Sequence, residues 1–272
     1  MLKSPVPMDL RTKIEETFLA PIGCALMARD TRIVERDGWY QVITPSSGSV
    51  VGNEVVLSRV AAGDADAFVR ETIAAYAAAG VPFRWSVGPL TEPAGFGAIL
   101  EAHGFRPSEG RGMAIAPEDW ITTAAPAQVT VESITPETID DFLAASDAGW
   151  ERTVPVADQA ARRDDHVRAL ATGRFHMFVA RRGGALAGSA TYITKARSAF
   201  LVGGVVLAEH RGGGVYRSLL DERLRRVSVL GLPLAVTHAR ESTSAPILER
   251  LGFETVFRSR MYYSPPVSPA GS

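Results

Sequence analysis

A glycine-rich turn constrains the fold of this chain more than any other segment. The turn covers residues 208–217, AEHRGGGVYR, and lies between a strand-like run over 200–207 and a helix-like run over 216–230. In such an arrangement successive backbone N–H groups point at one anion, and the helix N-terminus adds a positive partial charge. Glycines let the backbone approach the anion closely. The sequence therefore predicts a phosphate-binding turn.

The residues around this turn predict alternating strands and helices in the second half of the chain. Leu220, Leu224 and Val227 recur at helical spacing and share one face. The pair Gly183-Gly184 separates two strand-like runs and predicts a hairpin. Strands are expected over residues 129–133, 175–181, 187–194, 200–207, 234–237 and 253–263, and helices from residue 135 and over 158–172, 216–230 and 246–251.

The clearest boundary in the sequence is the small, polar segment 122–128, TTAAPAQ, which is typical of a linker. It predicts one domain over residues 1–121 and a second over 129–264, followed by a Pro- and Ser-rich tail, 265–272, that we expect to be disordered. Both domains are predicted to contain strands and helices. In the first, these are a strand within 50–60, a helix over 65–79, a strand over 83–87, a short helix over 93–103 and a strand over 113–115.

The two halves share three landmarks in the same order. Each has Gly-x-Pro before a strand, Ile-Leu-Glu before a Gly-Phe pair, and a Met at the same distance beyond that pair. This order suggests a duplicated unit, and chance similarity between helix ends is the alternative. The first half has no Arg-Gly-x-Gly turn between its strand and its helix, so the phosphate-binding turn is expected only in the second half.

Composition excludes several classes of function. The formal net charge is −1, so no global basic field exists to hold nucleic acid or an anionic membrane. Cys24 is the only cysteine, which rules out an intramolecular disulfide and fits a reducing compartment. The first residues, MLKSPVP, lack the apolar core of a signal peptide, and the histidines show no metal-ligand spacing. We therefore expect a cytoplasmic protein without a metal or a membrane anchor.

With these residues in place, the second half resembles the Gcn5-related N-acetyltransferase (GNAT) superfamily. Arg211 and Gly214 match two positions of the family's Arg/Gln-x-x-Gly-x-Gly/Ala motif, whereas Tyr216 replaces the final small residue. Leu251-Gly252-Phe253 matches a second family signature at the end of a short helix. The resemblance implies an α/β fold (an α+β mixed sheet) of two tandem GNAT-like domains, each a mostly antiparallel central sheet flanked by helices. The first half looks like a degenerate copy.

The resemblance also implies acetyl-CoA as the donor substrate. Its pyrophosphate would lie on the N–H groups at the start of the 216–230 helix, and its pantetheine arm would pair with the strand before the turn like an added strand. An amide of that strand would polarise the thioester carbonyl. The residues expected to bind the donor are Gly204, Val205, Val206, Arg211, Gly212, Gly213, Gly214, Val215, Tyr216 and Arg217.

The catalytic residues follow the family pattern less closely. The family usually has a Tyr on the short helix that protonates the departing thiolate, and the matching position here is Leu248. His238, just after a strand, is the first candidate for the general base, because its ordinary pKa suits proton transfer near neutral pH. A polar residue at a strand end is the alternative interpretation. Glu151 is the second candidate, in a loop where the family binds its acceptor.

Three functions remain open at this point. The first is an N-acetyltransferase that transfers an acetyl group directly to a primary amine of a small molecule, with a monomer favoured over a homodimer. The second is an acyl-CoA-binding module without turnover, suggested by Leu248 and Tyr216. The third is an aminoacyl-tRNA-dependent transferase, which the net charge disfavours, since the Arg223, Arg225 and Arg226 cluster is expected on a solvated helix face.

Overall fold

The computed structural model describes residues 8–25 and 28–266, and these residues pack into two compact units that are not contiguous in sequence. Unit 1 contains residues 114–237, and unit 2 contains residues 9–113 together with the chain from 238 onward. The N-terminal residues 1–7 and most of the predicted tail, 267–272, lie outside the described residues.

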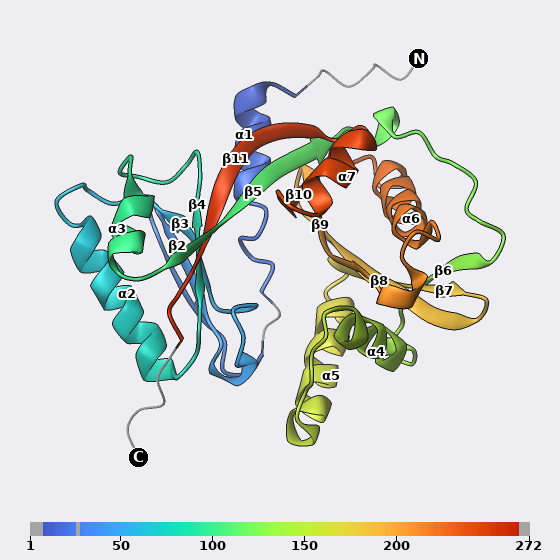
Figure 1. Ribbon diagram of the computed structural model, residues 1–272, viewed down its shortest axis with the longest axis horizontal. Coiled ribbons are helices and arrows are strands. Elements are labelled where there is room, and N and C mark those ends of the chain that lie inside the picture. Colours follow the sequence, from blue (N-terminus) through green and yellow to red (C-terminus); the bar gives the residue numbers. More distant parts are fainter. Residues whose placement is uncertain (1–7, 26–27, 267–272) are drawn as a thin grey trace. The chain divides into compact units, whose positions relative to one another are not determined.

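Unit 1 is built on a mixed sheet with the strand order β10-β9-β8-β7-β6 (Figure 1). All neighbouring pairs are antiparallel except β9 and β10, which run parallel. The predicted hairpin around Gly183-Gly184 is confirmed as β7 and β8. The strands are β6 (Val129–Ser133), β7 (Phe175–Arg182), β8 (Ala185–Thr194), β9 (Ser198–Val206) and β10 (Leu234–Arg240), of which β10 runs on past Thr237 into unit 2.

Helices cover both faces of the unit 1 sheet. The helix α6 (Val215–Val229) lies on one face, and α4 (Ile139–Gly149) and α5 (Val156–Ala171) lie on the other (Figure 1). The predicted apolar face of α6 is confirmed, since Leu220, Leu224 and Val227 are all buried. The expectation for Arg223 was wrong, because this side chain is buried on the same helix instead of facing solvent. Short 3-10 turns lie at Pro117–Asp119 and Ala208–His210.

Unit 2 has the strand order β1-β2-β3-β4-β11-β5, with β3 and β4 parallel. Its strands are β1 (Arg32–Arg36), β2 (Trp39–Ile43), β3 (Glu54–Ser58), β4 (Arg84–Val87), β5 (Arg106–Ile115) and β11 (Glu254–Tyr263). Its helices are α1 (Leu10–Phe18), α2 (Ala65–Ala79), α3 (Phe96–Ala102) and α7 (Ser244–Arg250), with a 3-10 turn at Pro45–Ser47. The helix predicted over 65–79 is confirmed as α2, which ends at Gly80 in the left-handed conformation that glycine favours.

The C-terminal strand explains why the compact units differ from the sequence halves. β11 pairs antiparallel with β4, with Met261 opposite Ser86 and Tyr262 opposite Trp85. The end of the second half therefore packs with the first half. The division into the domains 1–121 and 129–264, as two copies of a duplicated unit, stays a prediction. The linker residues 122–128 contain no helix or strand.

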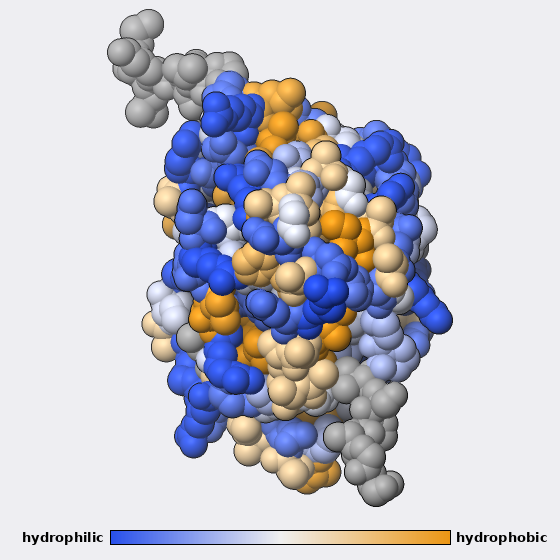
Figure 2. Space-filling model, turned by 90° about the vertical axis from the view of Figure 1, so that its left-hand side faces the viewer, coloured by the Kyte–Doolittle hydropathy of each residue, from blue (hydrophilic) through white to orange (hydrophobic). Residues whose placement is uncertain are grey.

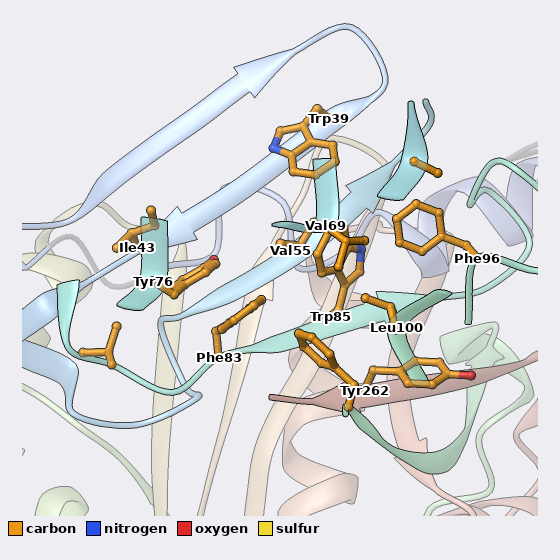
Figure 3. Close-up of a cluster of buried hydrophobic side chains, with 13 residues drawn as sticks. Trp39, Ile43, Val55, Val69, Tyr76, Phe83, Trp85, Phe96, Leu100 and Tyr262 are labelled. Carbon is orange, nitrogen blue, oxygen red and sulfur yellow. The ribbon is translucent and has the colours of Figure 1, made fainter. Parts of the chain in front are cut away.

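Aromatic side chains dominate the core of unit 2 (Figure 3). Tyr76 stacks on Phe83 with 3.8 Å between ring centroids, and Trp85 lies edge-on to Trp39 at 5.6 Å. On the surface, hydrophobic residues are interspersed with hydrophilic ones on the face that Figure 2 shows. Within residues 8–25 and 28–266, no helix is long and apolar enough to cross a membrane.

Candidate functional site

The glycine-rich turn of unit 1 ends in an open helix N-terminus. Gly214 precedes α6 in the left-handed conformation, with φ +80°, and Gly212 has φ +74°. Among the described residues no side chain caps this end of α6, and the first turn of the helix holds no acidic residue. Ser218 is the first residue of the helix whose N–H reaches a carbonyl, that of Gly214 at 3.0 Å. The preceding N–H groups are thus available to an anion.

Two basic side chains border this turn. A Cβ on Gly213 would lie 2.6 Å from Nη1 of Arg182, so this guanidinium sits directly against the turn. Arg211 is exposed, and its Nε lies 3.4 Å from the carbonyl oxygen of Val206. The sequence analysis missed Arg182, which the register of β6 and β7 brings to the turn through the pairing of Val129 with Arg182.

The side chain of Arg217 is held away from the turn. Its Nη2 donates to the carbonyl of Ile121 at 2.7 Å, and its guanidinium lies 5.2 Å from the centroid of the Trp120 ring. Trp120 in turn donates through Nε1 to Asp221 at 2.7 Å. Arg217 therefore offers the site its backbone N–H, while its side chain anchors the segment before the linker.

The strand before the turn has an open edge. β9 pairs with β10 only from Ser198 to Phe200, and the side-chain hydroxyl of Thr237 donates to the Leu201 carbonyl at 2.8 Å. Beyond that point, in the part of the chain that the structure describes, β9 pairs only with β8. The register shifts within this stretch, where Gly203 has φ +66°, which is a glycine-type β-bulge. An extended ligand can add to this edge over residues 202–206.

Tyr216 and Arg223 lie under the same open stretch. An ideal Cβ on Gly204 would be 3.5 Å from Cε2 of Tyr216 and 3.5 Å from Nη2 of Arg223. Both side chains therefore reach from α6 to the face of β9 that α6 covers. Burial raises the pKa of the Tyr216 phenol, while the neighbouring guanidinium of Arg223 acts in the opposite direction.

Glu151 stands at the other face of the unit 1 sheet, directly after α4. It is exposed and has φ +52°, an uncommon conformation for a residue other than glycine. Asp147 of α4 anchors this loop. It accepts two hydrogen bonds from Arg162, at 2.6 and 2.7 Å, and forms an ion pair with Arg152 at 3.2 Å. The indole of Trp150 next to Glu151 is 40% exposed.

His238 and Leu248 belong to unit 2. The Nε2–H of His238 donates to the Thr17 carbonyl at 2.8 Å, and its ring lies edge-on to Phe257. Burial lowers the pKa of this imidazole, so it is neutral at pH 7, the form that a general base needs. Leu248 is 3% exposed on α7. The predicted roles of His238 and Glu151 remain predictions.

Comparison with known proteins gives the family. An acetyltransferase (GNAT) domain model matches residues 130–256. The match places residues 130–256 in the GNAT superfamily. A GNAT from Kribbella flavida has a similar structure, with a TM-score of 0.67 and 16% identity over 93% of this chain and 96% of that one. Comparison with curated proteins gives no match.

Two further solved structures are similar to this chain over most of its length. A tandem GNAT protein from the clavulanic acid biosynthesis pathway has a TM-score of 0.55 and 18% identity, over 90% of this chain and 86% of its own. A functionally unknown protein from Staphylococcus epidermidis has a TM-score of 0.65 and 12% identity, over 86% and 94%. The tandem α/β fold predicted from the sequence is confirmed, and family membership supports acyl transfer as the general chemistry.

Proposed function

We propose that this GNAT protein is an acetyl-CoA-dependent N-acetyltransferase that acts on a primary amine of a small molecule. The observation that carries the proposal is the continuity of two open features in unit 1. The unpaired edge of β9 over residues 202–206 leads directly into the uncapped N-terminus of α6 at Gly214. A ligand with an extended arm and a pyrophosphate has the chemistry that fits both.

Donor binding follows from this continuity. The pyrophosphate would accept hydrogen bonds from the N–H groups of Gly212 and of Gly214 through Arg217, with Arg182 and Arg211 adding positive charge. The Gly213 N–H, also expected there, instead donates to the His210 carbonyl at 3.4 Å. The pantetheine arm would pair with Gly204, Val205 and Val206 along the open edge. Acetyl-CoA brings a thioester to this edge, where a backbone N–H of β9 can stabilise charge on the carbonyl oxygen.

The acceptor end is proposed at the exposed end of α4. The Glu151 carboxylate and the Trp150 indole can attract and flank a small cationic amine. The amine must lose a proton to attack the thioester, and His238 and Glu151 are the two candidates for the base. Most of the rate would come from holding amine and thioester together and from stabilising the oxyanion.

A second candidate function is acyl-CoA binding without turnover. Leu248 favours it, because a buried leucine stands where the family has its usual acid. The aminoacyl-tRNA reading has no such support, since the net charge is −1.

Calorimetric titration with CoA and acetyl-CoA, followed by thiol release across a panel of amines, distinguishes these functions. Dissociation constants in the micromolar range, about −8 kcal/mol, together with amine-dependent thiol release support the transferase. Binding without release for any amine supports the module. Absence of binding to either nucleotide contradicts both.

A further inference from the structure

A buried guanidinium without an acidic partner lies inside unit 1. Arg223 is only 2% exposed, and it donates through Nε to the Leu219 carbonyl at 3.0 Å and through Nη1 to the Thr191 carbonyl at 3.3 Å. The nearby acids on α6 are engaged elsewhere, Glu222 with Arg225 and Arg226, and Asp221 with Trp120. Over residues 8–25 and 28–266, the structure shows no ion pair for Arg223.

Such a group is costly in the interior of a protein. Buried charges are normally paired, because the loss of hydration is not otherwise compensated. Burial lowers the pKa of Arg223 to about 10, so the side chain still carries its charge at neutral pH. The two carbonyl oxygens supply only partial negative charge. Among the described residues, the positive charge of Arg223 therefore has only carbonyl oxygens as partners.

The guanidinium is aimed at the open stretch of β9. Nε and Nη1 have carbonyl partners, whereas Nη2 makes no hydrogen bond to the described residues. It lies 3.5 Å from the place where a Cβ on Gly204 would be, and Nη1 lies 3.8 Å from it. At these distances a Cβ would be in ordinary van der Waals contact, so the guanidinium packs against Gly204, next to the edge proposed to bind the thioester arm.

We propose that Arg223 is the residue that stabilises the CoA thiolate as it leaves during acyl transfer. This inference rests on the proposed function. In the step concerned, the amine nitrogen bonds to the thioester carbon, and the carbon–sulfur bond breaks with its electron pair going to sulfur. The base takes the proton of the amine, and Arg223 holds the resulting thiolate until water protonates it. A neighbouring arginine lowers the pKa of a thiol and so favours its anionic form.

This role accounts for Leu248. The family's Tyr supplies a proton to the departing sulfur, whereas a thiolate held by a cation can leave without one. The chain would thus replace an acid on one helix with a buried cation on another.

Titration of the thiol of bound CoA tests the inference without any turnover. Thiolate is followed by its ultraviolet absorbance in the wild-type protein, in Arg223→Met, which keeps the length of the side chain without its charge, and in Arg223→Lys, which keeps a charge. Arg225→Met removes an exposed arginine of the same helix as a control. In the wild type we expect the thiol pKa of bound CoA to lie at least one unit below that of free CoA, which is a tenfold rise in the ratio of thiolate to thiol. Arg223→Lys should keep part of this pKa shift.

The same variants separate the possible outcomes. Loss of the pKa shift in Arg223→Met, with the melting temperature unchanged or higher, supports the inference, since a buried charge has been removed. Gly204→Val, which adds methyl groups against the guanidinium and keeps its charge, should remove the shift as well. Normal CoA binding with an equal thiol pKa in the wild type and in Arg223→Met overturns the inference while the proposed function stands. No CoA binding by the wild type overturns the proposed function itself.

Discussion

The two units contain the same local arrangement in an open and a closed form. In unit 1, β9 leads through the glycine-rich turn into α6 and returns as β10, which is parallel to β9. In unit 2, β3 leads through a turn into α2 and returns as β4, which is parallel to β3. The connectivity and the strand direction are shared, and the differences lie at the helix N-terminus and at the strand edge.

The two helix N-termini differ in charge. α6 has no acidic residue in its first turn, and basic side chains border the glycines before it. α2 has Asp66 in its first turn, where the carboxylate interacts with the helix dipole and pairs with Arg70 at 2.6 Å and with His103 at 2.7 Å. A negative charge of the chain itself thus stands where an anionic ligand would bind.

The strand edges differ as well. The segment after β4 runs beside the end of β3, where the Glu92 N–H donates to the Ser58 carbonyl at 2.9 Å and the Val60 N–H donates to the Glu92 carbonyl at 3.2 Å. Trp85 donates to the Ser58 hydroxyl at 3.0 Å. Unit 2 fills with its own chain the position that β9 leaves open. Under the proposed function, a strand–turn–helix of this topology binds the donor only when its strand edge and its helix N-terminus are both left open.

The largest effect is expected in the closed arrangement. Trp85→Ala removes a fully buried indole from the core that Figure 3 shows, and it should lower the free energy of unfolding by about 3–5 kcal/mol. Val202→Ala on the open edge should cost below about 0.5 kcal/mol, because this side chain is 36% exposed. Denaturant titrations followed by circular dichroism compare the two. Equal losses of unfolding free energy in the two variants would contradict the view that the strand edge of unit 2 is part of a packed core and that the edge of β9 is not.

A pH-dependent effect is expected in unit 1. Burial against Phe142 lowers the pKa of His166 to about 4, and its Nδ1–H donates to the Arg162 carbonyl at 2.8 Å. Between pH 6.5 and about 4 the unfolded chain binds more protons than the folded one. Stability is therefore present above pH 6.5 and decreases as the pH falls, by up to about 3 kcal/mol.

Hydrogen exchange of α4 and α5 as a function of pH measures this effect. His166→Gln should flatten the pH dependence of the protection factors in these helices, while the protection factors in α2 follow the same course in both proteins. An unchanged acid sensitivity in His166→Gln would show that another group is responsible.

Charge at the turn should control donor affinity. Gly213→Asp places a carboxylate beside the uncapped end of α6 and should weaken CoA binding about 100-fold, or about 2.7 kcal/mol. Gly213→Asn forces the same shift of Arg182 without the charge, so it should weaken binding only a few-fold. Gly214 is less suitable, because its φ of +80° strains any side chain. Calorimetry that finds equal affinities for the two variants argues against a phosphate at this turn.

The smallest effect is expected from Asp66→Asn. This change removes the negative charge at the start of α2 but leaves the edge of β3 filled by Glu92 and Trp85. The number of CoA molecules bound per chain should stay at one. A second binding event in the variant would mean that charge alone closes unit 2.

Local signals in the sequence predicted much of this fold. The helix predicted over 65–79 is observed at those residues as α2, hydrophobic periodicity predicted the buried face of α6, and Gly183-Gly184 predicted the hairpin of β7 and β8. Long-range pairing carries no such signal. Nothing in the residues of β11 indicates that it pairs with β4, so the packing units could not be predicted.

The site shows the same limit. The turn at 211–214 could be predicted, because Arg211 and three glycines lie between a predicted strand and a predicted helix. Arg182 reaches the turn only through the register of β6 and β7, and Arg223 looked solvated because its neighbours Arg225 and Arg226 are charged as well. Its burial depends on Gly204, which lies far away in sequence but adjacent in space.

Hydrogen–deuterium exchange with and without CoA tests the central claim most directly. The claim is that one strand–turn–helix of the chain is open to the donor and the other is closed. We predict that saturating CoA slows exchange of the amides over residues 202–206 and 212–217 and leaves those over 54–66 unchanged. Protection around β3 and the start of α2, or none at β9 and α6, would contradict the account.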